Sequence, residues 1–134
     1  MEVATTLEAS ADDVWELIGA FNALSEWHPG VKHSTLEDGG RLRVLELANG
    51  SQLIERLQSF SQSERCYGYS IEKGPLPVVG YRSMVQVFEE TDTSCRVEWS
   101  GEFTPAGATE EDAVAIVRGI YCAGLDQLAK HFGA

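Results

Sequence analysis

The chain has 134 residues, which fits one domain that buries a hydrophobic core without help from disulfides or metals. Its formal net charge of -11 at pH 7 argues against nucleic-acid partners, because phosphate binding depends on clustered lysine and arginine. The three cysteines, Cys66, Cys95 and Cys122, are odd in number and widely spaced. They predict buried free thiols rather than a disulfide framework or a Cys-x-x-Cys metal site.

No basic segment followed by an apolar run opens the sequence, and no stretch approaches the roughly 20 apolar residues of a membrane span. We therefore expect a soluble, cytoplasmic protein without integral membrane association. The sequence also contains no repeat, low-complexity tract or linker, so residues 1–134 are expected to form a single domain.

The first elements are predicted to be a strand and two short helices. Residues 3–7 alternate between apolar and polar side chains, as in a strand. Ser10, followed three residues later by Asp13, forms an N-cap signature for a helix. Gly19 interrupts that helix, and a 3.6-residue period resumes at Phe21 until Pro29 stops it. Two small helices joined by a kink are therefore expected.

Residues 31–103 show about six strands separated by turn residues, with no helix between them. Asn49-Gly50 is a strong hairpin signal and predicts that residues 42–47 pair with residues 52–57. Strands joined by short turns pair antiparallel, because parallel pairing requires a crossover of a dozen residues or more. The predicted order is therefore a strand, two helices and an antiparallel meander.

The second half of this strand series contains a break. Residues 67–72 lead into residues 74–77 (Gly-Pro-Leu-Pro), which should leave the sheet because proline has no N–H to donate. Residues 81–88 and 96–103 then form another predicted hairpin. The whole series would leave one face of the sheet uncovered, and this face needs a helix to bury it.

The predicted cover is a long amphipathic helix over residues 109–132. Its apolar stripe consists of Ala113, Val117, Ile120, Tyr121, Gly124 and Leu128. Glycine in a helix interior costs roughly 1 kcal/mol relative to alanine, so Gly124 indicates a gap that something else requires. The occupant is either a closely approaching strand or a ligand, and we favour a ligand pocket. The sheet is expected to curl around this helix.

Five segments, in order, resemble one family. They are residues 21–29 (FNALSEWHP), 55–57 (ERL), 74–77 (GPLP), 97–103 (VEWSGEF) and 124–128 (GLDQL). Together they resemble the polyketide cyclase/dehydrase-like branch of the START-related SRPBCC superfamily, over nearly the whole chain. The resemblance implies an α+β helix-grip fold, in which a curved antiparallel sheet wraps around the C-terminal helix and leaves a ligand cavity. Members of this superfamily include carriers, receptors and cyclases, so the resemblance alone does not determine the function of this chain.

His28 is the histidine most suited to chemistry, since it lies between Trp27 and Pro29 where the second short helix ends. In a helix-grip protein this position is near the cavity mouth. His28 could exchange a proton with a ligand carbonyl or hydroxyl, or it could simply cap the helix and anchor Trp27. None of the three histidines has metal-ligand spacing, and we expect neither a metal nor a cofactor.

Glu55 and Arg56 are adjacent in a predicted strand, so they point to opposite faces. A two-residue turn at Asn49-Gly50 would set Val44 opposite Glu55 and Arg43 opposite Arg56. The period-two grouping of Glu55 with Leu42, Val44, Leu53 and Leu57 favours Glu55 inside. Three other apolar residues group with the arginines and favour the opposite face: Leu45, Leu47 and Ile54. On the inner face, Glu55 would be an acid/base or orienting group. The alternative is a cross-strand ion pair on the solvent face.

Aromatic side chains with polar tips should surround the cavity and suit a ring-bearing or lipid-like ligand, although each alone is a plausible core residue. The expected ligand-binding set is Trp27, His28, Glu55, Tyr69, Tyr81, Trp99, Tyr121 and Gly124, with His28 and Glu55 as the catalytic candidates. No sequence pattern supports a serine or cysteine nucleophile.

Three functions remain open from the sequence. The first is binding of a small hydrophobic or aromatic molecule in the internal cavity. The second is a polyketide cyclase or dehydratase that uses general acid/base groups in the same cavity. The third is a protein-interaction or stress-response module, which could be a homodimer with a vestigial cavity.

Overall fold

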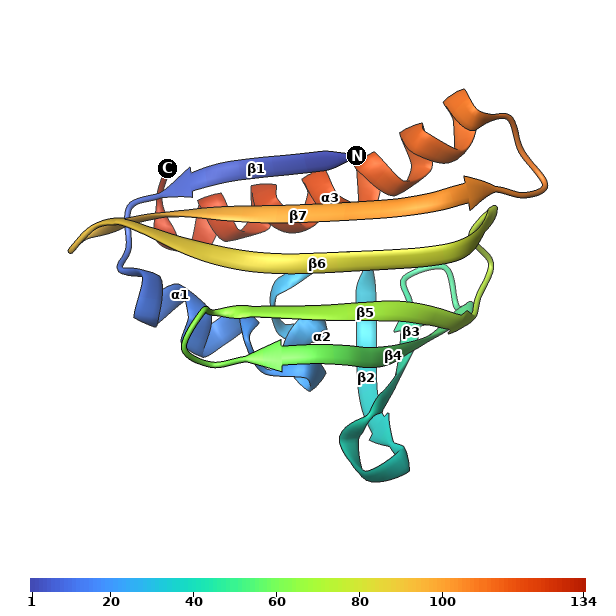
Figure 1. Ribbon diagram of the computed structural model, residues 1–134, viewed down its shortest axis with the longest axis horizontal. Coiled ribbons are helices and arrows are strands. Elements are labelled where there is room, and N and C mark those ends of the chain that lie inside the picture. The colour runs from blue at the N-terminus through green and yellow to red at the C-terminus, as the bar shows by residue number, and fades with distance from the viewer.

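The computed structural model describes residues 1–134. Seven antiparallel strands form one curved sheet in the spatial order β1-β7-β6-β5-β4-β3-β2. Figure 1 shows the long helix α3 running beside β1 and β7, while β2 and β3 turn across the direction of the remaining strands. The predicted α+β helix-grip fold is confirmed.

The N-terminal helices follow the predicted pattern. Helix α1 (Ala11–Ile18) is separated by a kink from the short turn η1 (Phe21–Ala23) and helix α2 (Leu24–Trp27). Ser10 caps α1, because its Oγ accepts a hydrogen bond from the Asp13 backbone N–H at 3.1 Å. The amphipathic period directs the apolar side of α1 into the core.

The strands are β1 (Glu2–Leu7), β2 (Val31–Glu37), β3 (Leu42–Leu47), β4 (Gln52–Ser61), β5 (Cys66–Lys73), β6 (Val78–Thr91) and β7 (Ser94–Pro105). The six strands expected between residues 31 and 103 are all present, and a short turn η2 (Asp38–Gly40) joins β2 to β3. Strands β6 and β7 extend beyond the predicted ranges. Residues 74–77 lie outside the sheet, between β5 and β6, as predicted from their prolines.

The register of the β3–β4 hairpin differs from the prediction. Its loop has three residues, because Leu47 N donates to Ser51 O at 2.8 Å and Gly50 N donates to Leu47 O at 2.9 Å. Gly50 has φ 88°, the left-handed conformation that a three-residue hairpin loop requires.

Arg43 therefore lies opposite Glu55, rather than opposite Arg56, and Leu45 lies opposite Leu53. The inward positions of β3 are Arg43 and Leu45, and the predicted inward positions Leu42 and Val44 are wrong. The inward position of Glu55 is confirmed, since Glu55 is only 4% exposed.

Helix α3 (Glu110–Phe132) begins at the predicted N-cap, where the Thr109 hydroxyl accepts from Asp112 N at 3.1 Å. Its buried residues are Ala113, Val117, Tyr121, Gly124, Leu125 and Leu128. No helix in the structure combines the length and the apolar character that crossing a membrane requires.

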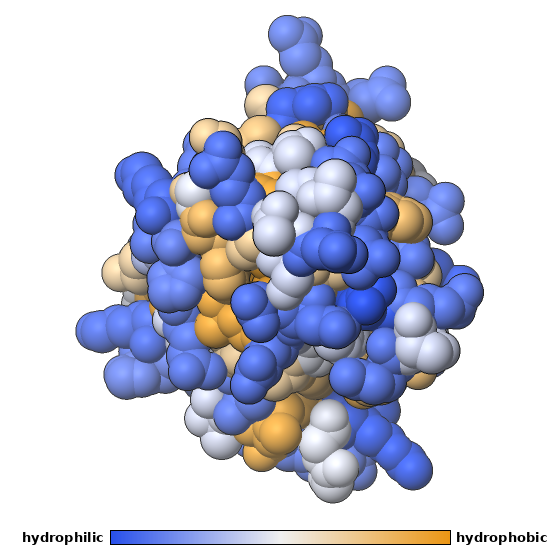
Figure 2. Space-filling view, turned by 90° about the vertical axis from the view of Figure 1, so that its left-hand side faces the viewer, coloured by the Kyte–Doolittle hydropathy of each residue, from blue (hydrophilic) through white to orange (hydrophobic).

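The surface carries the acidic excess of the sequence. In the view of Figure 2, hydrophilic side chains cover most of the surface and apolar atoms show between them in a broken central band.

All three cysteines are free, but only Cys95 is buried. Cys66 and Cys122 are half-buried, so the expectation of three buried thiols is wrong for those two.

Candidate functional site

An internal cavity of about 110 Å³ lies between the inner face of the sheet, α2 and α3. Five leucines supply most of its apolar wall: Leu24, Leu45, Leu47, Leu53 and Leu76. Val31 and Ile120 complete the aliphatic lining. These residues come from α2, β2, β3, β4, the proline-containing loop and α3, so the cavity exists only when the sheet curls around the helix.

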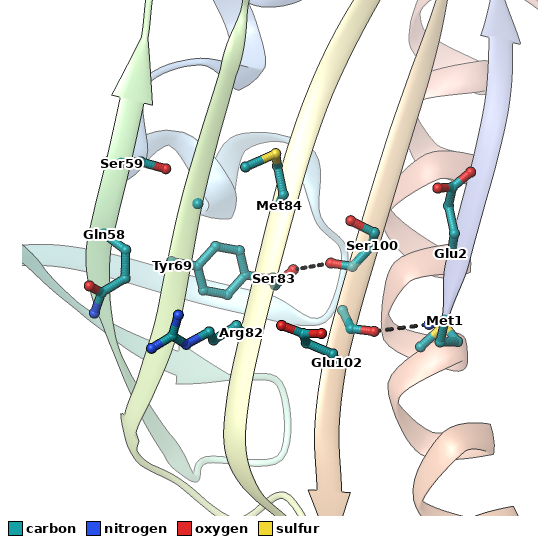
Figure 3. Close-up of a pocket in the computed structure, with 12 residues that line it drawn as sticks. Met1, Glu2, Gln58, Ser59, Tyr69, Arg82, Ser83, Met84, Ser100 and Glu102 are labelled. Atoms are coloured by element: carbon teal, nitrogen blue, oxygen red, sulfur yellow. Dashed lines mark hydrogen bonds between the residues drawn. The ribbon is translucent and has the colours of Figure 1, made fainter.

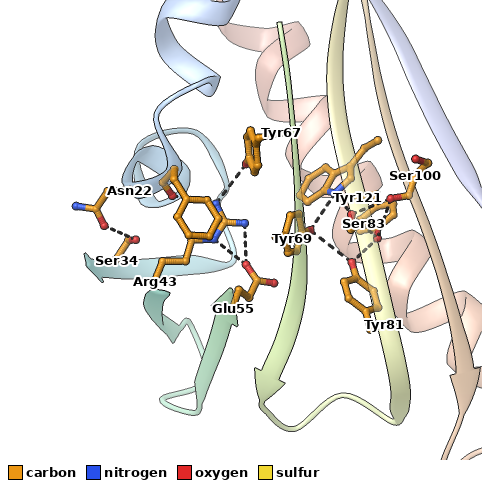
Figure 4. A network of polar contacts seen from close by, with 12 residues as sticks. Asn22, Ser34, Arg43, Glu55, Tyr67, Tyr69, Tyr81, Ser83, Ser100 and Tyr121 are labelled. Carbon is orange, nitrogen blue, oxygen red and sulfur yellow. Dashed lines mark hydrogen bonds and ion pairs between the residues drawn. The ribbon is translucent and has the colours of Figure 1, made fainter. Parts of the chain in front are cut away.

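One side of the cavity is aromatic and polar, and includes Tyr69, Tyr81 and Trp99. Trp99 Nε1 donates to the Tyr69 hydroxyl at 3.1 Å and to Ser83 Oγ at 3.0 Å. The Tyr69 and Tyr81 hydroxyls are 3.4 Å apart. Figure 4 shows these hydroxyls gathered between β5, β6 and α3. The cavity therefore has a hydrogen-bonding wall within an otherwise apolar lining.

Behind this wall, Tyr121 connects α3 to the sheet. Its hydroxyl contacts the Tyr81 hydroxyl and donates to Ser83 Oγ at 3.0 Å, while its ring stacks on Trp99 at 4.4 Å between ring centroids. Burial raises the pKa of Tyr121 to about 12 and raises the pKa values of Tyr69 and Tyr81. All three tyrosines are therefore neutral donors and acceptors near neutral pH. Tyr121 itself is not part of the cavity lining.

Glu55 is the carboxylate of the cavity, and its partner is Arg43. Arg43 Nε and Nη2 lie 2.8 and 2.7 Å from Glu55 Oε1. Arg43 Nη1 donates to the Phe21 carbonyl at 2.9 Å and to the Tyr67 hydroxyl at 3.3 Å. Figure 4 shows both contacts of the pair converging on one carboxylate oxygen. The ion pair joins β3, β4 and η1 beneath the cavity.

The Arg43 side chain is fully buried and is surrounded by aromatic rings. Its guanidinium carbon lies 4.2 Å from the Phe21 ring centroid and 4.8 Å from that of Tyr69, which favours the cation. Burial raises the pKa of Glu55, and the adjacent Arg43 charge opposes this shift. Protonation of Glu55 would leave a buried guanidinium without its counterion, so the pair is ionic near neutral pH.

His28 lies on the cavity lining, but both of its ring nitrogens contact the backbone. Nδ1 accepts from Gly30 N at 2.9 Å, and Nε2 is 2.7 Å from the Ile120 carbonyl. An acceptor at Nδ1 and a carbonyl at Nε2 require the neutral tautomer with its proton on Nε2. Burial lowers the pKa of His28. The ring therefore ties the end of α2 to α3, the anchoring role that the sequence left as the alternative to proton transfer.

Gly124 does not line the cavity, and aromatic rings fill the space beside it. A Cβ added at this position would lie 2.8 Å from Trp99 Cζ3, 2.9 Å from His28 Cδ2 and 3.0 Å from Trp27 Cζ3. The expectation of a ligand pocket at Gly124 is therefore wrong. The alternative of a closely approaching strand fits better, because the nearest ring, that of Trp99, belongs to β7. Trp27 also lies outside the lining, packed against Trp99 at 5.5 Å between centroids.

Of the eight expected binding residues, His28, Glu55, Tyr69, Tyr81 and Trp99 meet at the cavity. Sequence reasoning missed Arg43, Ser83 and the leucine wall. Arg43 alternates with Leu45 along β3, which would have placed both side chains on the inner face. This interpretation requires the correct hairpin register, in which Arg43 lies opposite Glu55.

A second, larger depression of about 540 Å³ lies on the outer face of the sheet. Figure 3 shows its lining on β1 and β4–β7, with Gln58, Arg82, Glu102 and Glu2 around it. Small residues at the floor, such as Gly68 and Ser100, produce the hollow. Most ligand sites enclose their ligand within apolar walls, and this open polar depression lacks such walls.

The curved sheet, the long C-terminal helix and the cavity between them define a small helix-grip domain. Residues 1–133 match the family described as "Polyketide cyclase / dehydrase and lipid transport". The chain belongs to that family. Among curated proteins, none matches the sequence.

Solved structures share this fold. The protein XoxI from Bacillus cereus is 42% identical with a TM-score of 0.96, over 98% of this chain and 94% of that one. Norcoclaurine synthase from Thalictrum flavum, in complex with dopamine and hydroxybenzaldehyde, is 21% identical (TM-score 0.71; 97% and 83% covered). The Zhui aromatase/cyclase from a Streptomyces species is 17% identical (TM-score 0.76; 98% and 91% covered). The two enzymes share the fold with this chain and support no closer inference.

Proposed function

We propose that the protein binds a small hydrophobic or aromatic molecule in the internal cavity between the sheet and α3. The observation that carries this proposal is a space of about 110 Å³ with an aliphatic lining and one polar wall. Ligand sites typically combine apolar walls with a few convergent polar groups. A protein interior without such a role is packed with few voids larger than a water molecule.

The cavity volume limits the size of the ligand. Typical pockets for drug-sized molecules hold roughly 300–1,000 Å³, whereas an engineered protein cavity of about 150 Å³ binds benzene. A cavity of about 110 Å³ therefore accommodates about one ring or a short aliphatic chain. A lipid chain would fit only if the loop bearing Leu76 moved away from the sheet.

The experiment measures the melting temperature and the amide NMR spectrum with a panel of single-ring and short-chain apolar compounds. A binder should raise the melting temperature and shift the amide signals of β4, β5 and the middle of α3. Leu76→Trp should abolish this response by filling the cavity from the loop. Leu36→Trp, at an exposed position on β2, is the matched control and should retain it. A panel without any responding compound contradicts the proposal.

The second candidate is a cyclase- or dehydratase-type enzyme that acts on a substrate in the same cavity. The specific support is the carboxylate of Glu55, which faces the cavity beside tyrosine hydroxyls. Such catalysis would depend on positioning and proton transfer rather than on a covalent intermediate. Since both nitrogens of His28 contact backbone groups, the acid/base role falls to Glu55 and Tyr69.

The enzyme hypothesis is tested by turnover of small β-dicarbonyl compounds that fit the cavity. Glu55→Gln should reduce turnover at least about tenfold, within the range that general acid/base groups contribute. His28→Gln should have a much smaller effect on turnover. If Glu55→Gln retains full turnover in a folded protein, the enzyme hypothesis fails while ligand binding stands.

A further inference from the structure

The cavity lining contains a hydrogen-bond acceptor without a protein donor. Arg43 directs both of its contacts with Glu55 to Oε1, and no protein hydrogen bond reaches Oε2 of the same carboxylate. The Glu55 side chain is 5% exposed and lines the cavity. Oε2 is therefore open to the cavity and can accept a hydrogen bond from a ligand, and hydrogen bonds to a charged acceptor are stronger than those between neutral groups.

The same wall contains a donor whose proton has no good acceptor. Ser83 Oγ donates to the Ser100 carbonyl, and Tyr121 donates to Ser83. Each hydroxyl has only one proton, so Tyr121 must accept the proton of Tyr81 at their contact. The proton of Tyr69 then has two weak acceptors: the Tyr81 oxygen at 3.4 Å, beyond the usual range for hydroxyl hydrogen bonds, and the Tyr121 oxygen. This proton is free to turn toward a ligand.

Glu55 and Tyr69 are neighbours on the inner face of the sheet. They lie on adjacent strands, where Leu57 pairs with Tyr69 and Glu55 pairs with Ile71, so the two inward side chains are diagonal neighbours. Long and aromatic side chains reach across such a diagonal. Both residues line the same cavity of about 110 Å³, so one small ligand group can meet both side chains.

We propose that the ligand is a small uncharged alcohol or phenol whose hydroxyl donates to Glu55 Oε2 and accepts from the Tyr69 hydroxyl. This inference rests on the proposed function of the cavity and adds the class of ligand. Among common polar groups, a hydroxyl both donates and accepts at one atom. A carboxylate could accept from Tyr69, but it has no proton to donate to Glu55 Oε2 and would meet the negative charge there. An ammonium ligand could not accept a hydrogen bond from the Tyr69 hydroxyl. Its positive charge is also not needed, because Arg43 already balances the charge of Glu55.

The test compares three probes of equal ring size, phenol, toluene and benzoate, by NMR titration of the wild-type protein. A purely apolar cavity favours toluene, because phenol loses hydrogen bonds to water when it is buried. We expect phenol to bind about tenfold more tightly than toluene, as a charge-assisted hydrogen bond permits. Benzoate should not bind measurably.

Two tyrosine variants locate the effect. Tyr69→Phe removes the proposed donor and retains the ring, and Trp99 keeps Ser83 as an acceptor at 3.0 Å. This variant should lose the preference for phenol. Tyr67→Phe removes a hydroxyl from the same strand and the same buried face, but Tyr67 is not part of the cavity lining. It should retain the preference.

The outcomes separate this inference from the proposed function. If toluene binds the wild-type protein as tightly as phenol, or if benzoate binds best, the hydroxyl inference is overturned and the apolar cavity site stands. If none of the three probes binds, both proposals are overturned. The wild-type comparison decides the question even if Tyr69→Phe does not fold.

Discussion

At the residue scale, Gly124 is required because three aromatic rings pack directly against its Cα and leave no room for a side chain. Substitution by alanine would improve the intrinsic helix propensity by about 1 kcal/mol. The added Cβ would lie within 3.0 Å of ring atoms of Trp99, His28 and Trp27. These rings are packed against one another, so none of them can yield without moving the others.

We therefore expect Gly124→Ala to lower the free energy of unfolding by about 1–3 kcal/mol, in the range of overpacked cores. Gly119→Ala is the matched control, because Gly119 is exposed on the same helix with nothing within 4 Å of its Cβ position. That variant should be more stable than the wild type by up to about 1 kcal/mol. Urea denaturation measures both values, and equal stability of the two variants would contradict the packing argument.

His28 gives the domain a pH dependence at the residue scale. Burial lowers its pKa below the ordinary 6.5, the bond to the Ile120 carbonyl opposes this shift, and the Arg43 charge adds to it. Below about pH 6.5 the unfolded chain therefore binds a proton that the folded protein does not. The free energy of unfolding should decrease as the pH falls from 7 to 5.

His28→Gln should show a flatter dependence over this interval in chemical denaturation experiments. His33→Gln is the control, because His33 is exposed on β2, with its side chain 73% accessible. It should retain the dependence of the wild type. A wild-type stability that does not change between pH 7 and 5 would exclude the role assigned to the neutral His28 ring.

At the scale of elements, the Arg43–Glu55 pair fastens β3 to β4 and η1. Removing only the carboxylate, as in Glu55→Leu, leaves a buried guanidinium without a counterion and should cost about 3–5 kcal/mol of stability. The double variant Arg43→Met with Glu55→Leu removes both charges. It should recover most of this loss, because replacing a buried pair by apolar residues is often neutral.

Denaturation of the wild type, both single variants (Glu55→Leu and Arg43→Met) and the double variant gives the coupling between the two positions. A double variant that is as unstable as Glu55→Leu would show that the hydrogen bonds of Arg43 to the Phe21 carbonyl and Tyr67, rather than its charge, hold these elements together.

At the scale of the whole molecule, the net charge of -11 opposes the compact state through self-repulsion. Screening at higher salt should therefore stabilise the domain. We expect the melting temperature to rise by about 2–5 °C between about 0.02 M and 0.3 M NaCl, as the Debye length shortens.

A variant with Glu89→Gln, Glu90→Gln and Asp92→Asn, all exposed near the β6–β7 turn, should show a smaller increase. A melting temperature that falls with added salt would indicate that surface ion pairs, such as Arg65 with Asp12, outweigh the repulsion.

Local signals in the sequence were sufficient for most of the fold. Ser10 and Thr109 mark the helix starts, because each side chain caps its own helix within three residues. The prolines in residues 74–77 mark the break between β5 and β6, because they lack the N–H that a ladder needs. The alternation along β4 favoured an inward Glu55 but did not decide between Glu55 and Arg56, because the inner face of the sheet could not be identified from the sequence.

The tertiary structure decided what these elements enclose. The loop at Gly50 fixed the register, and the register paired Arg43 with Glu55 instead of Arg56. The rings of Trp27, His28 and Trp99 filled the gap at Gly124, and the cavity formed instead among leucines far apart in the chain. Helix caps and proline breaks act over a few residues, so the sequence by itself determines them. Cavity position, ion pairing and hydroxyl direction arise only when the strands curl around α3.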